Sequence, residues 1–359
     1  MKTMREGFTT GSCAAAAALA SCLWRRDGEC PPRVEITLPG GRIFQTGVFP
    51  RGPYVCGVTK DAGDDPDITH GCEARVLVEI GGGDGGISFK AGEGVGVVTK
   101  PGLKIPVGEA AVNPVPRRMI AQAVRSVYPS RAAVVTVSIP GGGELARRTY
   151  NPRLGVAGGL SILGTTGVVR PMSEDALTET IALELSVIRS RGVDAAALVF
   201  GSQGEDALAR LYPGIPVAQM SNYVGFALDE CAGLGFARLL VAGHPGKLAK
   251  VSAGATHTHS GYGDARREAI ITHLALMGAG VDLMKDVYEC VTTDAAIGLI
   301  DRAGRRDVWN RMADAAQSYC EARIRGAAAV DIIFMDGGGL PLGFSKRIRE
   351  DAERWNRAT

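Results

Sequence analysis

The stretch AALVFGSQG (residues 196–204) decides the fold class, because an apolar strand runs directly into a small polar loop with two glycines. The same pattern recurs in LSILGTTG (160–167), VAQMSN (217–222) and RLLVAGHPG (238–246). Helices are predicted at 173–190, 205–212 and 223–234, so strands alternate with helices as in a parallel sheet. We therefore expect all four loops along one sheet edge, where helix N-termini and free backbone N–H groups bind small polar ligands.

The first part of the chain has a different, α+β pattern. An alanine-rich helix is predicted at 13–26, and a helix at 117–128. Alternating strands 33–38 and 42–46 form a hairpin around PGG, and further strands are predicted at 54–59, 74–80 and 132–139. We predict an α+β domain over 1–150, facing the substrate, and an α/β ligand-binding domain with a largely parallel sheet and a helical C-terminal part over 151–359. The last strand, 329–334, could join either sheet.

Composition excludes several function classes. The 359 residues carry a net charge of +2 without a basic stripe, which argues against nucleic acid as a partner. No apolar run is long enough to cross a membrane, and the N-terminal stretch is expected to fold with the protein rather than act as a signal peptide. The eight cysteines show no C-x-x-C spacing, which predicts reduced thiols in a cytoplasmic protein.

Two segments of the first domain are candidate binding sites. In GFTTGSC (7–13), the hydroxyls of Thr9, Thr10 and Ser12 either cap the alanine helix or mark a helix start that a large ligand approaches closely. The loop KDAGDDPDITH (60–70) departs from the calcium-loop pattern. It could hold a metal, form a turn cluster paired to Lys60, or hydrogen-bond pyrrole-like N–H or ribose hydroxyl groups of a ligand.

Basic residues and histidines supply further candidates. GEGVG (92–96) lacks the helix of a dinucleotide fingerprint, although Lys100 and Lys104 after it could face an anion. GHPGKLAK (243–250) is not a Walker A loop, and its two lysines near a helix start indicate carboxylate binding or a solvated face. In ATHTHS (255–260), structural or substrate hydrogen bonding is preferred over zinc, for which His244 would be a third ligand.

The chain resembles the cobalt-precorrin-5B C1-methyltransferases of the CbiD type, which act in anaerobic cobalamin biosynthesis. The matching segments begin with GFTTGSCAAAAALA (7), DAGDDPDITHG (61), GEGVGVVTKPGL (92) and NPVPRRMI (113), and continue with NPRLGVAGGLSILGTTGVVRPMS (151) and GHPGKLAKVSAGATHTHS (243). They follow the family order through about three quarters of the chain. Ser12 stands where many relatives have threonine. His257 departs from the family pattern, so His259 is the preferred functional histidine.

The resemblance implies S-adenosylmethionine as the methyl donor and an anionic cobalt tetrapyrrole as the acceptor, with cobalt-precorrin-6A as the product. Cobalt then enters only as part of the substrate, and no protein metal site is required. Methyl transfer is an in-line displacement, so the protein mainly positions the reactants in a dry cleft, and the macrocycle carbon can serve as its own nucleophile. A homo-oligomer and transient contact with neighbouring pathway enzymes are left open. Two alternative functions also remain, a non-catalytic corrinoid carrier and a metal-dependent hydrolase using Asp61, Asp64, His70, His257 and His259.

Roles follow residue by residue from this resemblance. The predicted catalytic residues are Thr10, Asp61 and His259. The predicted donor-binding residues are Gly164, Thr165, Thr166, Gly167, Gly201, Ser202, Asn222, Gly243 and His244. The predicted substrate-binding residues are Thr9, Ser12, Lys60, Asp64, His70, Lys100, Lys104, Arg170, Lys247, Lys250 and His257, with the cations meeting the acetate and propionate arms of the ring.

Overall fold

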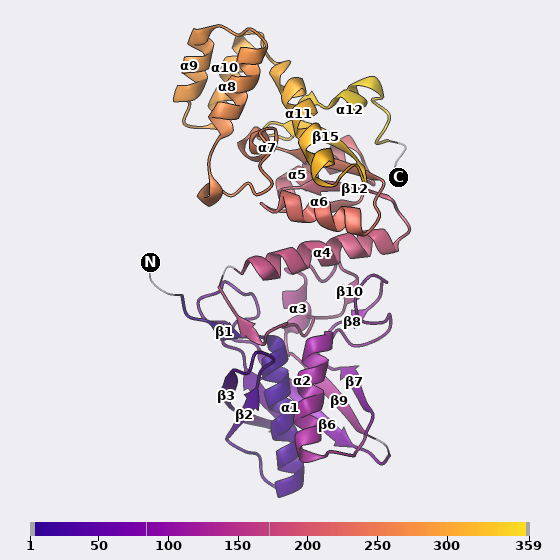
Figure 1. The fold of residues 1–359 in the computed structure, drawn as a ribbon. Helices are drawn as coiled ribbons and strands as arrows, with labels where there is room; N and C mark the ends of the chain where they lie inside the picture. The colour runs from indigo at the N-terminus through magenta and orange to yellow at the C-terminus, as the bar shows by residue number, and fades with distance from the viewer. Residues whose placement is uncertain (1–3, 84, 172, 357–359) are drawn as a thin grey trace. The chain divides into compact units, whose positions relative to one another are not determined.

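The computed structural model describes residues 4–83, 85–171 and 173–356 (Figure 1). The chain divides into two compact units, 1–175 and 176–359, which are described separately below. The mixed α+β first unit and the largely parallel sheet of the second confirm the predicted fold class. Residues 151–175 lie in the first unit, so the loop Gly164–Gly167 belongs with the α+β part.

The first unit contains small sheets, three helices and the start of a fourth among its described residues. In chain order they are β1 (Gly7–Phe8), α1 (Thr10–Asp27), β2 (Arg33–Thr37), β3 (Ile43–Gly47), β4 (Phe49–Gly52), β5 (Val55–Thr59), β6 (Glu73–Ile80), β7 (Ile87–Ala91), β8 (Val97–Val98), α2 (Pro114–Val127), β9 (Ala133–Ser138), α3 (Gly142–Ala146), β10 (Val156–Ala157) and β11 (Val168–Val169). The fourth helix, α4 (Glu174–Ser190), begins here and continues into the second unit.

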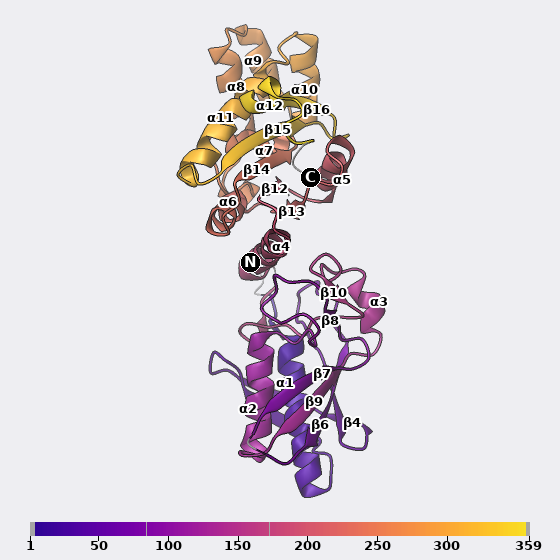
Figure 2. The same ribbon diagram turned by 90° about the vertical axis from the view of Figure 1, so that its right-hand side faces the viewer.

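The core of the first unit lies between one sheet and two helices. The sheet has the order β4-β5-β6-β9-β7, and α1 and α2 lie side by side against it (Figure 2). Strand β9 alternates buried and half-buried residues, as expected of a strand with one face on the core. Residues Ala14–Ala18 of α1 are fully buried. Their small side chains let the helix approach α2 and the sheet closely, which explains the alanine run.

The predicted strand at 160–163 does not belong to the parallel sheet, and this part of the prediction was wrong. Leu160 and Ile162 form isolated bridges with Val95 and Val112, and both side chains are buried in the core of the first unit. An apolar alternation indicates that one face of a segment is buried, but it does not specify which sheet or core buries that face. The loop that follows therefore belongs to the first unit and does not follow a strand of the parallel sheet.

The second unit is a parallel sheet with one antiparallel edge strand. Its elements are β12 (Ala195–Val199), α5 (Ser202–Leu211), β13 (Val217–Gln219), α6 (Val224–Gly233), β14 (Arg238–Gly243), α7 (Pro245–Val251), η1 (Ser260–Tyr262), α8 (Arg266–Leu276), α9 (Val281–Glu289), α10 (Thr293–Arg302), α11 (Val308–Arg323), β15 (Ala329–Met335), β16 (Pro341–Phe344) and α12 (Lys346–Glu350). The strand order is β13-β12-β14-β15-β16. The last predicted strand, β15, therefore joins this second sheet.

Helices cover both faces of this sheet. One core contains α6, α7 and α11 with Ala196, Leu198 and Val241, and the other contains α5 with Ala197, Val199 and Ala242. Neighbouring residues of a strand point to opposite faces, so both faces of β12 and β14 are buried, as in other doubly covered parallel sheets. Helices α8, α9 and α10 form a group of their own beside this layer (Figure 1). Among the described residues, no helix is both long and apolar enough to span a membrane.

Candidate functional site

Three of the four predicted loops meet at the C-terminal edge of the parallel sheet. Val199 is in register with Gln219 on one side and with Ala242 on the other. The loops that follow these residues contain Gly201 and Ser202, Ser221 and Asn222, and Gly243 and His244. The prediction of a shared edge is therefore confirmed for these three loops and wrong for 164–167.

The strand order creates a switch point between β12 and β14. From β12 the chain passes through α5 to β13 on one side, whereas from β14 it continues to β15 on the other side. The two loops consequently lead to helices on opposite faces of the sheet, and such a divergence opens a crevice at the carboxyl ends of the strands. A Cβ on Gly243 would lie 2.4 Å from the Phe200 ring, so the glycine lets that ring pack directly against the end of β14.

The first turn of α5 leaves backbone donors free at this switch point. Gly201 precedes the helix without a side-chain cap, and a Cβ built on it would meet nothing within 4 Å. The N–H groups of Ser202 and Gln203 have no hydrogen-bond partner among the described residues. Free amides at the start of a ten-residue helix suit a carboxylate, because the helix dipole and the N–H groups both favour an anion.

His244 is held in place by two contacts at the end of β14. Its Nδ1 accepts the Gly246 N–H at 3.1 Å, which makes His244 the N-cap of α7. Its Nε2 therefore carries the ring proton in the neutral form and donates to Asp294 Oδ1 at 3.1 Å. Sequence reasoning did not find Asp294, which stands fifty residues further along the chain, and only the tertiary fold reveals it.

A buried network fixes the loop 255–260 against the same edge. Asn222 accepts from Thr258 twice, through its backbone carbonyl at 3.0 Å and through its Oδ1 at 3.1 Å. Lys250 is only 4% exposed, and its Nζ donates to the carbonyls of Thr258 and Gly263, each at 3.0 Å. The ammonium of Lys250 thus holds the backbone in place. Its predicted contact with substrate stays a prediction.

The two remaining histidines follow this network. His257 packs between the rings of Tyr223 and Tyr262, with centroid distances of 4.9 and 4.2 Å, and its Nδ1 accepts the His259 N–H at 3.3 Å. Its buried Nε2 has no partner among the described residues. His259 is exposed and caps η1 through the Gly261 N–H at 3.0 Å. The imidazole Nε2 of His259 is therefore directed to solvent rather than used in the fold.

Lys247 differs from Lys250 although both stand on α7. Its ammonium lies 5.4 Å from the centroid of the Phe200 ring. Burial lowers the pKa of Lys247 below its ordinary value, and the nearby charge of Lys250 lowers it further. Lys247 has no ion pair among the described residues, so no described carboxylate neutralises its charge beside Phe200.

In the first unit, the predicted residues of 7–13 join α1 to the loop 163–167. Thr9 caps α1 through the Ser12 N–H, and the buried Ser12 hydroxyl donates to the Gly167 carbonyl at 2.6 Å. The Leu163 N–H donates to Thr10 Oγ1 at 2.9 Å, and its carbonyl accepts the Gly11 N–H. This arrangement matches the capping interpretation, because the loop occupies the helix start. The adjacent Thr165 and Thr166 are exposed.

The loop 60–70 forms two separate ion pairs. The buried Lys60 pairs with Asp67, whose carboxylate also accepts from Thr69. Burial raises the pKa of Asp67, but the Lys60 charge and the hydrogen bonds outweigh burial and leave it lowered. Arg5 binds both carboxylate oxygens of Asp61, and this hydrogen bonding is the main cause that lowers the pKa of Asp61 to about 2.

The other predicted residues of this unit lie around these pairs. Asp64 accepts the Arg5 N–H at 2.7 Å, and His70 Nδ1 accepts the Ala62 N–H at 3.1 Å. Lys100 and Lys104 are exposed, and Arg170 lies 3.4 Å from Glu6. The Lys60–Asp67 pair fits the predicted turn cluster paired to Lys60, whereas sequence reasoning missed Arg5, the partner of Asp61. Within the described part of the chain, no group of three or more histidine, cysteine, aspartate or glutamate side chains is arranged to hold a metal ion.

Comparison with known proteins identifies the family. A CbiD family model matches residues 1–171, and a model for the CbiD C-terminal domain matches residues 257–346. The cobalt-precorrin-5B C(1)-methyltransferase of Photorhabdus laumondii is 43% identical over 98% of this chain and 96% of its own length. The protein of that name from Desulfitobacterium hafniense is 42% identical over 92% and 87%. The chain belongs to the CbiD family.

Membership of the CbiD family confirms the resemblance predicted from the sequence motifs. A crystal structure of a cobalamin biosynthesis protein (cbiD) from Archaeoglobus fulgidus aligns with 77% of this chain and 85% of its own, at 25% identity and a TM-score of 0.39. The first CbiD model includes the loops 60–70 and 163–167, and the second begins at His257. The strands β12, β13 and β14 lie between the two matched regions.

Proposed function

We propose that this CbiD-family enzyme transfers a methyl group from S-adenosylmethionine to C1 of cobalt-precorrin-5B, giving cobalt-precorrin-6A, and that the donor binds at the β12–β14 crevice. The methyltransferase class and the macrocyclic acceptor follow from the family relatives. The position of the donor is supported by one observation above all, the switch point at which the Gly201 and Gly243 loops diverge.

The groups at this crevice fit the polar ends of such a donor. The free N–H groups of Ser202 and Gln203 suit the carboxylate of its amino-acid part. Asn222 uses its Oδ1 for Thr258, while its Nδ2 has no partner among the described residues and can donate to the adenosine. The open space above Gly201 and the ring of Phe200 provide room and an apolar surface for the part between these ends.

The donor supplies an electrophilic methyl group. Its methyl–sulfur bond breaks with the electron pair remaining on sulfur, while the electron-rich ring carbon forms the new bond. The positive charge on sulfur disappears in this step, so strong solvation of the donor would slow the reaction. The protein therefore contributes by aligning the two reactants and excluding water, which Phe200 and the fixed loop 255–260 support.

The anionic acceptor requires cations near the same edge. Lys247 has its charge available there, and burial has already removed part of its hydration. His259 presents a free ring nitrogen on the neighbouring loop, so we retain it as a residue that contacts the acceptor. The residues of the first unit remain individual predictions, and we expect the enzyme to act in the cytoplasm.

Two measurements test this proposal. Calorimetry should detect binding of S-adenosylmethionine to the protein, and labelled donor with cobalt-precorrin-5B should give a product heavier by one methyl group. Asn222→Asp keeps the Oδ1 that accepts from Thr258 but removes the amide donor, so donor affinity should fall about tenfold, the size expected for one lost hydrogen bond. Gly233→Ala on α6 is the control, because a Cβ there meets nothing within 4 Å. Binding of the macrocycle without binding of the donor would instead favour a corrinoid carrier.

A further inference from the structure

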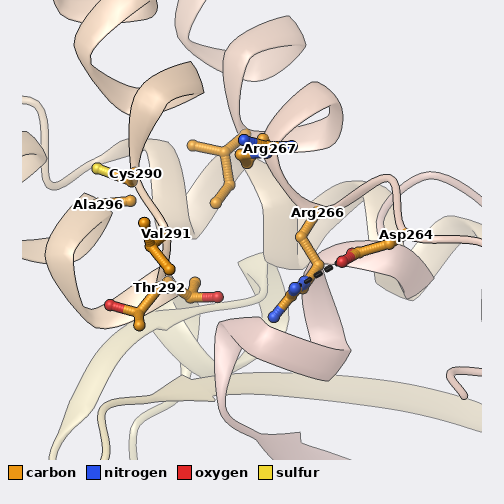
Figure 3. A pocket seen from close by; sticks show the side chains of 9 residues that line it. Asp264, Arg266, Arg267, Cys290, Val291, Thr292 and Ala296 are labelled. Carbon is orange, nitrogen blue, oxygen red and sulfur yellow. Dashed lines mark hydrogen bonds and ion pairs between the residues drawn. The ribbon is translucent and has the colours of Figure 1, made fainter. Parts of the chain in front are cut away.

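A pocket lies at the start of α10. It has a volume of about 270 Å³ and is bordered by the N-terminal residues of α8, the segment 290–292 and the first turn of α10 (Figure 3). Pockets that enclose a whole drug-sized ligand usually measure about 300–1,000 Å³. This pocket is therefore too small for the macrocycle or for the whole donor, and it suits a short side arm of a larger molecule.

Two arginines give the pocket a positive side. Figure 3 shows Arg266 beside Asp264, and their side chains form a bidentate pair with distances of 2.6 and 2.5 Å. Arg267 has no carboxylate partner among the described residues. Its guanidinium donates to the Tyr288 carbonyl at 2.7 Å and lies over the Tyr288 ring at 4.9 Å. These contacts hold the group in place while leaving most of its N–H donors unused.

The opposite wall adds neutral donors. Thr293 lines the pocket and is only 8% exposed, yet its hydroxyl makes no hydrogen bond with any described residue. A hydroxyl that borders a pocket and has no described protein partner can donate to a ligand or to water. Thr293 is also the first residue of α10, where the backbone N–H groups point out of the helix. Ile270, Val291 and Ala296 supply an apolar lining beside these polar groups.

We propose that this pocket binds one carboxylate-bearing aliphatic arm of the acceptor, with Arg267 and Thr293 as its ligands. The inference rests on the proposed function, because the acetate and propionate arms of the macrocycle supply this chemistry. The pocket adjoins the sheet edge at two places. His244 at the end of β14 bonds Asp294, the residue after Thr293. Gly246 lies near Thr293, because a Cβ built on Gly246 would lie 3.7 Å from Thr293 Oγ1. An arm bound here would hold the ring next to the β14 loop.

Arg267→Ala tests the proposal, because it should change the KM for the acceptor without changing the affinity for the donor. We expect the KM for cobalt-precorrin-5B to rise about 10- to 100-fold, since a hydrogen-bonded charged pair is lost, while the Kd for S-adenosylmethionine stays within twofold. Arg267→Lys should recover part of the loss, because it keeps the charge but not the planar fork. Lys285→Ala on α9 is the control. It also removes one positive charge, but Lys285 is 72% exposed and does not line the pocket.

Thr293→Val separates binding from folding. The hydroxyl has no hydrogen-bond partner among the described residues, so its removal should leave the urea midpoint unchanged while raising the KM for the acceptor several-fold. The proposal would be overturned if Arg267→Ala and Thr293→Val both had the same acceptor KM as the Lys285→Ala control.

A free dicarboxylate distinguishes failure of this inference from failure of the proposed function. Glutarate should bind the wild-type protein in calorimetry without donor or acceptor, and Arg267→Ala should abolish that binding. Equal glutarate binding by both proteins would reject a carboxylate pocket even if methyl transfer were never observed. If glutarate binding depends on Arg267 but the acceptor KM is unchanged in Arg267→Ala, the pocket binds a free carboxylate. That result would overturn the proposal that it binds an arm of the acceptor.

Discussion

The two lysines of α7 should respond differently to the same substitution, one mainly in stability and the other mainly in binding. Lys250→Met removes a buried ammonium that donates to the carbonyls of Thr258 and Gly263. Lys247→Met removes an ammonium whose described contact is the face of the Phe200 ring. The lysines stand three residues apart on one helix, so helix propensity and side-chain size change equally in both variants.

The expected cost follows from the hydrogen bonds that are lost. Each hydrogen bond to a charged group contributes about 1.5–3 kcal/mol. Thr258 is buried, so its carbonyl would lose its charged donor without replacement, whereas the exposed Gly263 can bind water instead. Relief of the desolvation of Lys250 offsets part of this loss. We therefore expect Lys250→Met to lower the free energy of unfolding by about 2–4 kcal/mol. Lys247→Met should cost about 1 kcal/mol or less, the value of a partly exposed cation–π contact.

Urea unfolding followed by tryptophan fluorescence measures this difference. Trp309 and Trp355 are buried in the second unit, so a Trp24→Phe background removes the signal of the first. With a denaturant dependence of about 2 kcal/mol per molar urea, the midpoint should fall by about 1–2 M in Lys250→Met. In Lys247→Met the midpoint should fall by about 0.5 M or less, while the acceptor should bind more weakly. Equal midpoints in the two variants would refute the assignment of Lys250 to the buried network.

Three further predictions concern the other sites. Gly243→Ala would place a Cβ 2.4 Å from the Phe200 ring, and such overpacking costs about 1–3 kcal/mol. Calorimetry should therefore show donor affinity falling about 5- to 100-fold, whereas an affinity equal to that of Gly233→Ala would contradict donor binding beside Gly243. Thr10→Val leaves the Leu163 N–H without its acceptor and should lower the free energy of unfolding of the first unit by about 1–3 kcal/mol. Urea unfolding followed by Trp24 fluorescence measures this change, and an unchanged midpoint would argue against the contact. Arg5 lowers the pKa of Asp61 to about 2, so the stabilisation from this pair is complete above the unfolded pKa of about 4 and is lost as the pH falls towards 2. The free energy of unfolding should therefore depend less on pH in this range in Asp61→Asn, and an unchanged pH dependence would exclude the pair as its source.

Local patterns predicted most elements of the fold because they depend on neighbouring residues. The alanine helix begins at Thr10 rather than 13, since Thr9 caps it, and the hairpin β2–β3 forms where PGG predicts a turn. The segment 160–163 shows the limit of such patterns. Its buried face was predicted correctly, but the identity of the surface that covers it depends on contacts with Val95 and Val112, which are distant in sequence.

The same limit applies to the candidate site. The loops at Gly201 and Gly243 were visible as strand ends, whereas their place at a switch point depends on the strand order, which the sequence does not display. The partners Arg5 and Asp294 act across 56 and 50 residues. Neither lies in a motif that would single it out, and a charged residue in isolation is most simply a solvated one. The pocket at Arg267 was missed for the same reason.

Unused hydrogen-bonding capacity is what separates the predicted residues that support the fold from those left for a ligand. Ser12 and Lys250 donate to internal carbonyls, so substituting them should act first on stability. The backbone N–H of Ser202 and the ring nitrogen Nε2 of His259 have no partner among the described residues, so changes there should act on binding without loss of stability. A folded chain leaves such groups unpaired at little cost only where water or a ligand can reach them. The internal network around Thr258 then has a functional consequence, because it holds the loop that carries His259 before any ligand binds, and so reduces the entropy that binding must overcome.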